Sequence, residues 1–508
     1  MGSEIADQYR CTHLVQIINF AIALISTKHI NSLNILAFVV LVANATIAQD
    51  NHYAWMQYGS RNSILYNAGV SKFEDQSAVI INPATLSQAK SSSFNFNSNV
   101  VAFNNIKFKN GLGQDFNITS SNFNVLPSMA SGIYKPKNAE KNLVIGYALY
   151  HANTDNLDIS DRTESRLNLI NETESPGVEN YLAQYTLDNR MNEFTVVAGV
   201  GWNLSEKFSI GISQSFTYRD VESREKFAAY VVVDPDTGAS LDLTGSNLNY
   251  NAEYNALMTY TKLGFNYTGE KWDLGLVISS PTLGIFGSGN ILADYSLTNF
   301  RLDTNLNVRR RSFLANGQIE DIKAKYKYPL SVTLGGSRQV DNVRLYGAVS
   351  WYSALKQYTV MDPGTASFVQ PPSADNVLIT SKILSVWSSN KTVVNASIAA
   401  DWELKSQNHL LFSFRNDQHY AEIEPEASGN NLAKKIWNNW HLIVGNQREF
   451  KSSALAVGLG FNYGVNNDFP QPASFQDPTE GNLLQGKRGK GVVKSIGVQL
   501  LLSYSFTL

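Results

Sequence analysis

Cysteine is the scarcest residue of this 508-residue chain: it occurs once, as Cys11, close to the start. If the N-terminus is removed on export, the mature chain has no thiol, and both disulfide bonds and thiolate chemistry are then excluded. The chain also lacks an excess of charge of either sign, because 41 Lys and Arg residues stand against 43 Asp and Glu residues. A formal charge of −2 gives no reason to expect nucleic acid as a partner.

A catalytic or metal-binding pattern is also missing. No Gly-x-Ser-x-Gly elbow and no phosphate-binding loop occurs in a usable context. The histidines after residue 48 are scattered, and no two of them have the spacing of a helical metal site. They are His52, His151, His409, His419 and His441. We therefore predict no enzymatic activity, no metal ion and no cofactor.

Long apolar runs occur only near the N-terminus, so helical membrane spans are not expected in the rest of the chain. The apolar segment 33–48 follows Lys28 and ends at Ala48 in a small-residue exit, which is typical of a secretory signal peptide. A transmembrane anchor is the alternative, but the segment is short for a bilayer and contains two asparagines. We predict that residues 1–48 are a signal peptide, in which residues 1–27 are either a long leading region or an upstream extension.

What the chain does contain is alternation of apolar and polar residues. In Val493–Leu508 the even positions from Ile496 onward are all apolar or aromatic, and the odd positions are mostly small or polar. A period of two indicates a strand with one apolar and one polar face. A soluble β-sandwich would alternate too. These strands, however, run past the roughly five or six residues that are usual in soluble proteins.

The spacing of the strands favours a membrane barrel over a sandwich. Short polar turns at 136–141, 204–207, 268–271, 340–342, 404–407 and 449–452 separate long polar segments at 105–122, 155–191, 220–252, 282–325, 354–391, 419–436 and 464–492. Outer-membrane barrels have short turns on one side, long loops on the other and an even number of strands. The predicted strands are 92–104, 124–135, 142–154, 192–204, 207–219, 253–268, 271–281, 326–339, 342–353, 392–404, 407–418, 437–449, 453–463 and 493–508.

Residues 49–90, between the signal peptide and the first strand, do not alternate. They hold a short apolar run and a turn signal, which are Val79, Ile80 and Ile81 followed by Asn82, Pro83 and Ala84. Pro83 fixes its own φ and moves Asn82 out of the α region. One interpretation is an ordinary turn before the first strand. The other is a plug, because a barrel of fourteen strands is too wide to be filled by its own wall side chains.

The order of these features resembles the N-terminal hatch of the long-chain fatty-acid transporter family, the FadL/TodX-like outer-membrane proteins. The matching pieces are Ala68-Gly69, Asp75–Ala78 and Asn82-Pro83-Ala84, with further likeness in Trp272–Leu283, Tyr328–Gly335 and Leu345–Trp351. The resemblance implies the strand count that the spacing gave. We predict an all-β fold: a 14-stranded antiparallel transmembrane β-barrel over residues 91–508, with an N-terminal hatch, residues 49–90, plugging the lumen.

The resemblance also implies a function, which is outer-membrane transport of hydrophobic small molecules, fatty-acid-like or aromatic. It implies gating by the hatch and lateral release through a gap in the barrel wall near the third strand. Gly146 in that strand is the candidate for the gap, since a glycine in a strand can mark a bulge or kink. The expected partners are the hydrophobic ligand, outer-membrane lipid and lipopolysaccharide, and the outer-membrane assembly machinery, which would recognise the strand end at Tyr504, Phe506 and Leu508.

Two other functions stay open at this point. The same barrel could be a cell-surface scaffold or shuttle that docks secreted partners on its long segments 282–325 and 354–391. A barrel enzyme is the third hypothesis, and it lacks a set of nucleophile residues. A continuous apolar pocket beneath the external loops would favour transport, whereas a filled polar lumen with an exposed apolar loop surface would favour a scaffold.

Two surface features complete the predictions. Aromatic residues gather at predicted strand ends, where interfacial girdles are expected because amphipathic rings favour the headgroup region. They are Trp202, Tyr218, Trp272, Tyr328, Trp351, Tyr352, Trp402, Trp437, Trp440, Tyr504 and Phe506. The basic run Arg309–Arg311 is either a solvated charge cluster or a contact for lipopolysaccharide phosphates.

Overall fold

The computed structural model describes residues 52–53, 57–136, 143–171, 173–233, 241–301, 309–364, 384–405, 407–422, 430–432 and 435–508. All of these lie in one compact unit, residues 46–508. The predicted signal peptide, the first residues of the predicted hatch and most of the predicted turn at 136–141 lie outside the described residues. In the part that is described, no helix has the length and apolar character needed to cross a membrane.

Strands make up nearly all of the regular structure. They are β1 (Ser93–Lys109), β2 (Ile118–Tyr134), β3 (Leu143–Leu167), β4 (Glu179–Asn203), β5 (Phe208–Val232), β6 (Leu243–Thr268), β7 (Trp272–Ser279), β8 (Leu283–Phe300), β9 (Arg311–Lys323), β10 (Ser331–Val340), β11 (Val343–Tyr352), β12 (Leu355–Met361), β13 (Val386–Asn390), β14 (Val393–Lys405), β15 (Asn408–Asp417), β16 (Asn430–Asn431), β17 (Asn438–Glu449), β18 (Ser453–Pro470) and β19 (Lys490–Thr507). Short helical turns are α3 (Arg61–Ile64), η1 (Gly69–Ser71), α4 (Ala78–Ile81), η2 (Pro83–Gln88) and η4 (Glu480–Asn482).

Fourteen of the strands close into an antiparallel barrel, which confirms the predicted fold class. Around the ring they are β1 to β7, β10, β11, β14, β15, β17, β18 and β19, and pairing of β1 with β19 joins the two ends of the chain. β8 and β9 are added to the side of β6 and are not part of the closed ring. The small sheet of β12, β13 and β16 is separate from it.

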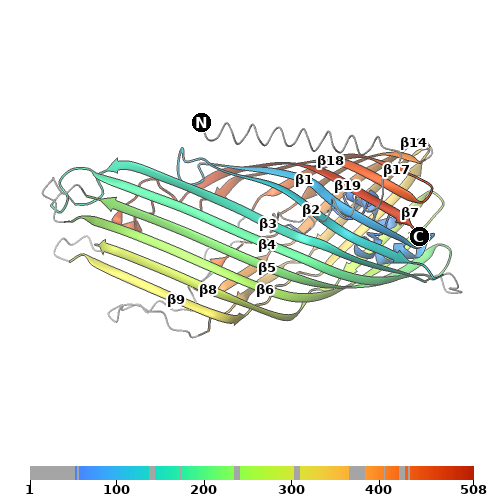
Figure 1. Cartoon of the computed structure of the whole chain (residues 1–508), viewed down its shortest axis with the longest axis horizontal. Coiled ribbons are helices and arrows are strands. Elements are labelled where there is room, and N and C mark those ends of the chain that lie inside the picture. Colours follow the sequence, from blue (N-terminus) through green and yellow to red (C-terminus); the bar gives the residue numbers. More distant parts are fainter. Residues whose placement is uncertain are drawn as a thin grey trace. The chain divides into compact units, whose positions relative to one another are not determined.

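Three of the predicted loops, 155–191, 220–252 and 282–325, consist largely of strand, and this is a correction. β3 to β6 continue past the end of the barrel wall with unbroken pairing of β4 to β5 and of β5 to β6, and β8 and β9 widen this extension (Figure 1). The apolar alternation stops there because the outer face of the sheet no longer meets lipid. Outward side chains on β5 change from Tyr218 to Asp220 and Arg224, while the strand itself goes on.

The apolar band of the barrel is visible along single strands. On β4 the outward apolar side chains begin with Phe194 and end with Trp202, and these two are both 46% exposed. Less exposed, inward-facing residues alternate with the outward ones. These nine residues match the roughly 9–11 that a tilted strand needs to cross the hydrocarbon core. Beyond Phe194 the outward position is Asn192, which is paired with Asp220. The apolar band therefore ends at the level where the strand extensions begin.

The predicted aromatic girdle is correct only in part. Outward, exposed members include Trp202, Trp272, Trp402 and Trp440. Three predicted members, Tyr328, Tyr352 and Trp437, instead lie on the inner side of the wall: Trp437 is 1% exposed, Tyr352 stacks on Tyr53, and Tyr328 donates its hydroxyl proton to Glu193. Aromatic residues also have high β-propensity, so their position at a strand end does not tell which face of the wall they occupy.

Candidate functional site

Residues 57–89, the described part of the predicted hatch, are a set of short helical turns inside the barrel at the end that also holds the C terminus (Figure 1), and we call this segment the hatch. Asp75 organises the first half of this segment. Its carboxylate accepts hydrogen bonds from the backbone N–H groups of Arg61, Asn62 and Ser77 at 2.8, 2.9 and 2.8 Å. A buried carboxylate that receives several N–H donors satisfies backbone groups that such short helices leave open.

The Asn82-Pro83-Ala84 tripeptide begins η2. Asn82 has an extended backbone, with φ −151° and ψ 103°, and Pro83 occupies the first helical position, where its missing N–H costs nothing. The Asn82 side chain accepts from Ala84 N at 3.1 Å and donates to the carbonyl oxygen of Val70 at 2.8 Å. It also donates to the carbonyl of Phe265 on β6 at 3.2 Å. One amide thus caps a helix, joins two parts of the hatch and attaches the hatch to the wall.

The barrel wall has glycine residues where the tripeptide contacts it. Gly201, Gly211 and Gly264 lie in register on β4, β5 and β6. A Cβ on Gly201 would come within 2.6 Å of the Pro83 carbonyl oxygen, and one on Gly264 within 2.9 Å of Ala84 N. A Cβ on Gly211 would collide with the Pro83–Ala84 peptide bond. Only glycine allows so close an approach of hatch backbone to strand backbone.

The apolar run makes up most of α4 and is largely buried. Val79 and Ile80 are 0% and 4% exposed, and they share a cluster with Met129, Ile133 and Val197 of the wall. Ile81 is half-buried and packs near Val70 and Val277. The hatch therefore presents aliphatic side chains to an aliphatic part of the inner wall.

Polar contacts hold the other side of the hatch. Arg61 pairs with Glu74 at 3.4 Å and with Asp401 of β14 at 3.1 Å, and Tyr346 of β11 donates to Glu74 at 2.8 Å. Burial raises the pKa of Glu74, although Arg61 and Lys72 act in the opposite direction. The hatch is thus tied to β6 by the Asn82 amide and to β11 and β14 by this ionic cluster.

Gly146 does not lie at a break in the wall. It is paired with Ile133 on β2 and with Gly199 on β4, so the strand is continuous there on both sides. A Cβ on Gly146 would approach Leu86 Cδ2 at 2.8 Å and Val79 Cβ at 3.0 Å. Its role in the structure is that of the other inward glycines, namely to make room for the hatch.

The wall does separate further along the same strand. Pairing of β2 with β3 extends only from Tyr134 and Ile145 to Met129 and Tyr150. Beyond that point β2 remains paired with β1 as far as Ile118, and β3 remains paired with β4 as far as Leu167. We call this separation, between 118–128 and 151–167, the β2–β3 seam. A side-chain hydrogen bond from Asn122 to the carbonyl of Asn156, 3.1 Å long, crosses it.

The β2 edge of the seam carries an outward aromatic residue, and the hatch contacts the β3 edge from the inner side. Phe123 on β2 and its partner Phe103 on β1 face outward and are 48% and 42% exposed. On the inner side, the Tyr58 hydroxyl of the hatch donates to the carbonyl of Ala152 at 3.0 Å. The Tyr58 ring also meets that of Tyr150 edge to face, with centroids 4.7 Å apart.

The lumen above the hatch is lined with tyrosines around a buried ion pair. Glu193 and Arg219 are each 1% exposed and 2.8 Å apart. The Arg219 guanidinium lies 3.7 Å from the centre of the Tyr326 ring, and both Glu193 oxygens accept from Tyr328, at 2.8 and 2.7 Å. The signal that could have found this cluster is the position of Glu193 and Arg219 on the polar phase of two alternating strands.

The extended strands are held together at their far end by another ionic cluster. Arg310 donates to Glu174 at 2.7 Å and pairs with Glu480, and Arg301 pairs with Glu174. The side chain of Arg310 is only 11% exposed. Arg310 is therefore engaged within the chain, and it is not the free basic residue that the run Arg309–Arg311 suggested.

Comparisons with known proteins bear on the fold. A comparison with protein-family models and a comparison with curated protein sequences both find no match. Among solved structures, the Pseudomonas putida toluene transporter TodX is similar with a TM-score of 0.55 and 13% identity, over 89% of this chain and 99% of that one. A Pseudomonas aeruginosa FadL homologue is similar with a TM-score of 0.50 and 12% identity, over 91% and 100%. The chain thus has the fold of these outer-membrane barrels.

Proposed function

We propose that this protein carries hydrophobic small molecules, fatty-acid-like or aromatic, across the outer membrane, with gating by the hatch and lateral release through the β2–β3 seam. The observation that supports the proposal is the seam itself, where β2 and β3 stop pairing beside the exposed Phe123 and where Tyr58 of the hatch contacts Ala152. An apolar solute that leaves sideways enters lipid and avoids the aqueous compartment. TodX, which has the same fold, is described as a toluene transporter.

Hatch gating is tested at the tripeptide. Replacing both Asn82 and Pro83 by Ala removes the amide contacts to Val70 and Phe265 and frees the turn, while neither residue is in a strand. We expect the barrel to assemble normally, with slower uptake of a hydrophobic probe or a raised leak of small polar solutes through reconstituted protein. Lys487→Ala, an exposed loop substitution, serves as the control. Uptake at the wild-type rate without leak would mean that the hatch is a passive N-terminal segment.

Lateral release is tested at the seam. In a mature chain without cysteine, Asn122→Cys and Asn156→Cys can be joined by a short thiol-reactive bridging reagent that reductant removes. Bridging should slow uptake of the hydrophobic probe, and reduction should restore it. A matched bridge between Asp158→Cys and Asp188→Cys joins strands that are already paired, so it should have no effect. Equal uptake with both bridges closed would exclude the seam as the exit.

The scaffold alternative finds less support. Large apolar side chains that are exposed among the described residues lie mostly on barrel strands, such as Ile398, Leu334 and Val196, where lipid covers them. A docking surface for secreted proteins would instead need such side chains on the loops. Surface capture of secreted proteins by a variant that no longer takes up the probe would favour the scaffold.

A further inference from the structure

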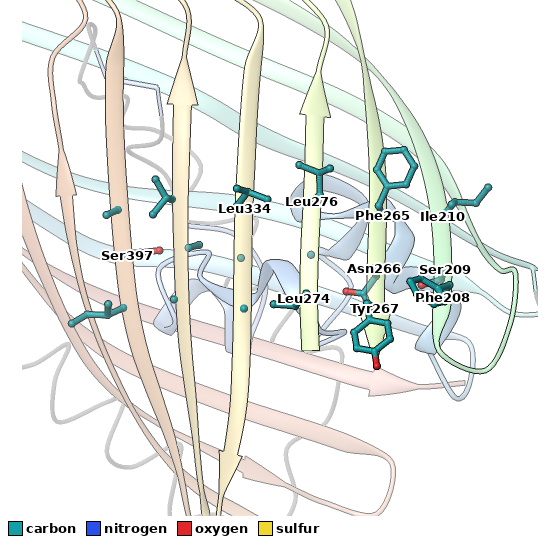
Figure 2. A pocket seen from close by; sticks show the side chains of 18 of the residues that line it. Phe208, Ser209, Ile210, Phe265, Asn266, Tyr267, Leu274, Leu276, Leu334 and Ser397 are labelled. Atoms are coloured by element: carbon teal, nitrogen blue, oxygen red, sulfur yellow. The ribbon is translucent and has the colours of Figure 1, made fainter. Parts of the chain in front are cut away.

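The outer face of the barrel holds an apolar groove of about 810 Å³ near the short-turn end. Figure 2 shows it from outside, with Leu274, Leu276 and Leu334 on neighbouring strands in front of the hatch. Leu334 and Ile398 at the groove are 60% and 63% exposed, which places this surface toward the membrane. The groove extends from β5 to β14 at the short-turn end, whereas the seam lies between β2 and β3, so the two are separate features of the wall.

Two outward glycines create the depression. Gly336 on β10 and Gly347 on β11 are cross-strand partners, flanked in the same row by Leu274 on β7 and Ile398 on β14. A Cβ on Gly347 would meet no atom within 4 Å, and one on Gly336 would come no closer than 3.5 Å to Leu274. Nothing in the chain's own packing therefore demands glycine at these two positions, in contrast to the glycines under the hatch.

A cation lies just beyond the residues that line this groove. Arg338 follows Gly336 on the same face of β10, is exposed, and has its guanidinium 4.8 Å from the centre of the Trp272 ring. Within the part of the chain that the structure describes, Arg338 forms no ion pair. It lies two residues from the end of β10, where a basic side chain reaches the headgroup level of a bilayer.

We propose that this groove is a binding site for one phospholipid of the leaflet at the short-turn end, with an acyl chain over Gly336 and Gly347 and the phosphate on Arg338. An acyl chain fits because the groove lies in the lipid-facing band and its side chains are aliphatic or aromatic. A phosphate fits because a guanidinium binds it in a bidentate way and Trp272 holds the guanidinium in place. The site requires only a barrel embedded in a membrane, so a test of it does not depend on the proposed transport.

The bound acyl chain would also cover a part of the wall where glycines leave few side-chain atoms. On the inner side of the same strands, a Cβ on Gly335 would collide with Val70 of the hatch. Glycines thus face the hatch on one side of β10 and the groove on the other. An ordered acyl chain restores the dispersion contacts that glycine leaves unmade on the outer side.

The experiment is native mass spectrometry of the full barrel, extracted from membranes in mild detergent, which counts and identifies retained lipid. Wild type should keep one phospholipid. Gly347→Leu adds a side chain to the groove at a position where a Cβ meets no atom of the chain, and Arg338→Gln removes the cation. Either should lower retention roughly tenfold, the factor for one charge-assisted hydrogen bond or a comparable loss. Gly284→Leu, also at an open glycine, and Arg448→Gln, whose cation lies over Phe450 away from the groove, should retain lipid as wild type does.

Each other outcome overturns the proposal. Equal retention in all five proteins would mean a lipid bound elsewhere or nonspecifically. Retention of lipopolysaccharide instead of phospholipid would place the groove in the opposite leaflet from the one proposed. A mass equal to two protein chains would mean that the groove is a contact between two copies of the protein. If Gly347→Leu does not fold, Ala396→Leu fills the same groove from β14, and the Arg338→Gln comparison is unaffected.

Discussion

The buried pair of Glu193 and Arg219 gives the sharpest stability prediction. Both side chains are 1% exposed, and Arg219 also donates to the Tyr254 hydroxyl at 2.9 Å. In Arg219→Met the glutamate stays buried and loses its counter-charge, which typically costs about 3–5 kcal/mol. The carboxylate can escape by taking a proton, but at pH 7 this costs a glutamate about 3.7 kcal/mol by itself. We expect the free energy of unfolding to fall by about 3–4 kcal/mol.

A second substitution, at Glu193, should reverse most of this loss of stability. In Arg219→Met with Glu193→Leu neither charge of this pair remains, and replacing a buried ion pair by apolar residues of similar volume is often neutral or stabilising. The double variant should therefore unfold within about 1 kcal/mol of wild type. Arg162→Met is the control, because Arg162 and Glu164 are 3.1 Å apart but 55% and 62% exposed, and such a pair contributes about 0–1 kcal/mol.

The assay is denaturant unfolding of the barrel reconstituted in lipid vesicles, followed by the fluorescence of its eight tryptophans. The midpoint and slope give the free energy of each variant. If Arg219→Met changes the free energy no more than Arg162→Met does, water or another charge must reach Glu193, and the dry, paired environment described for it is wrong. If the double variant is as unstable as the single one, packing rather than charge explains the loss.

Three further predictions follow from the wall and its ends. Gly211→Leu should displace the Pro83–Ala84 peptide and raise the leak of small polar solutes, whereas Gly347→Leu on the outer face should not. Equal leak from both variants would mean that the inward glycines do not hold the hatch in place. Deleting Phe506–Leu508 removes the partner of Phe94 and the bond from Leu508 N to the Ser92 carbonyl at 2.9 Å, so heat-modifiable, folded barrel should be lost; a normal yield would contradict this. In intact cells a membrane-impermeant maleimide should label Glu164→Cys on the strand extension and spare Ser205→Cys in the turn before β5, and the reverse result would invert the topology.

The sequence predicted the strands that meet lipid and missed those that do not. Val493–Leu508 alternates because one face meets hydrocarbon and the other meets the lumen, and that contrast is written in residue types. On β5 beyond Tyr218 the outward face carries Asp220, Glu222 and Arg224, and a polar stretch is equally compatible with a loop. What keeps this stretch extended is pairing with β4 and β6, which single residues do not encode.

The seam was outside the reach of sequence reasoning for the same reason. Gly146 was the natural candidate, since a strand glycine marks either a kink or a close approach of other backbone. In the structure it is the second of these, because Leu86 and Val79 of the hatch lie against it. The separation begins after Tyr150, where β2 stays paired with β1 and β3 with β4 while β2 and β3 no longer pair with each other.

The turn of the hatch can be predicted from its own residues, but its place against the wall cannot. Asn82, Pro83 and Ala84 can be assigned to a turn from their chemistry alone. Their attachment depends on Gly201, Gly211 and Gly264, which are far apart in the sequence and are brought side by side only by strand register. A glycine in an alternating strand therefore indicates that another backbone segment approaches the strand closely. Which segment this is depends on how the closed barrel brings the strands together. Here three strands supply one glycine each to the same peptide, so a change in any of them should act on the hatch before it acts on the barrel.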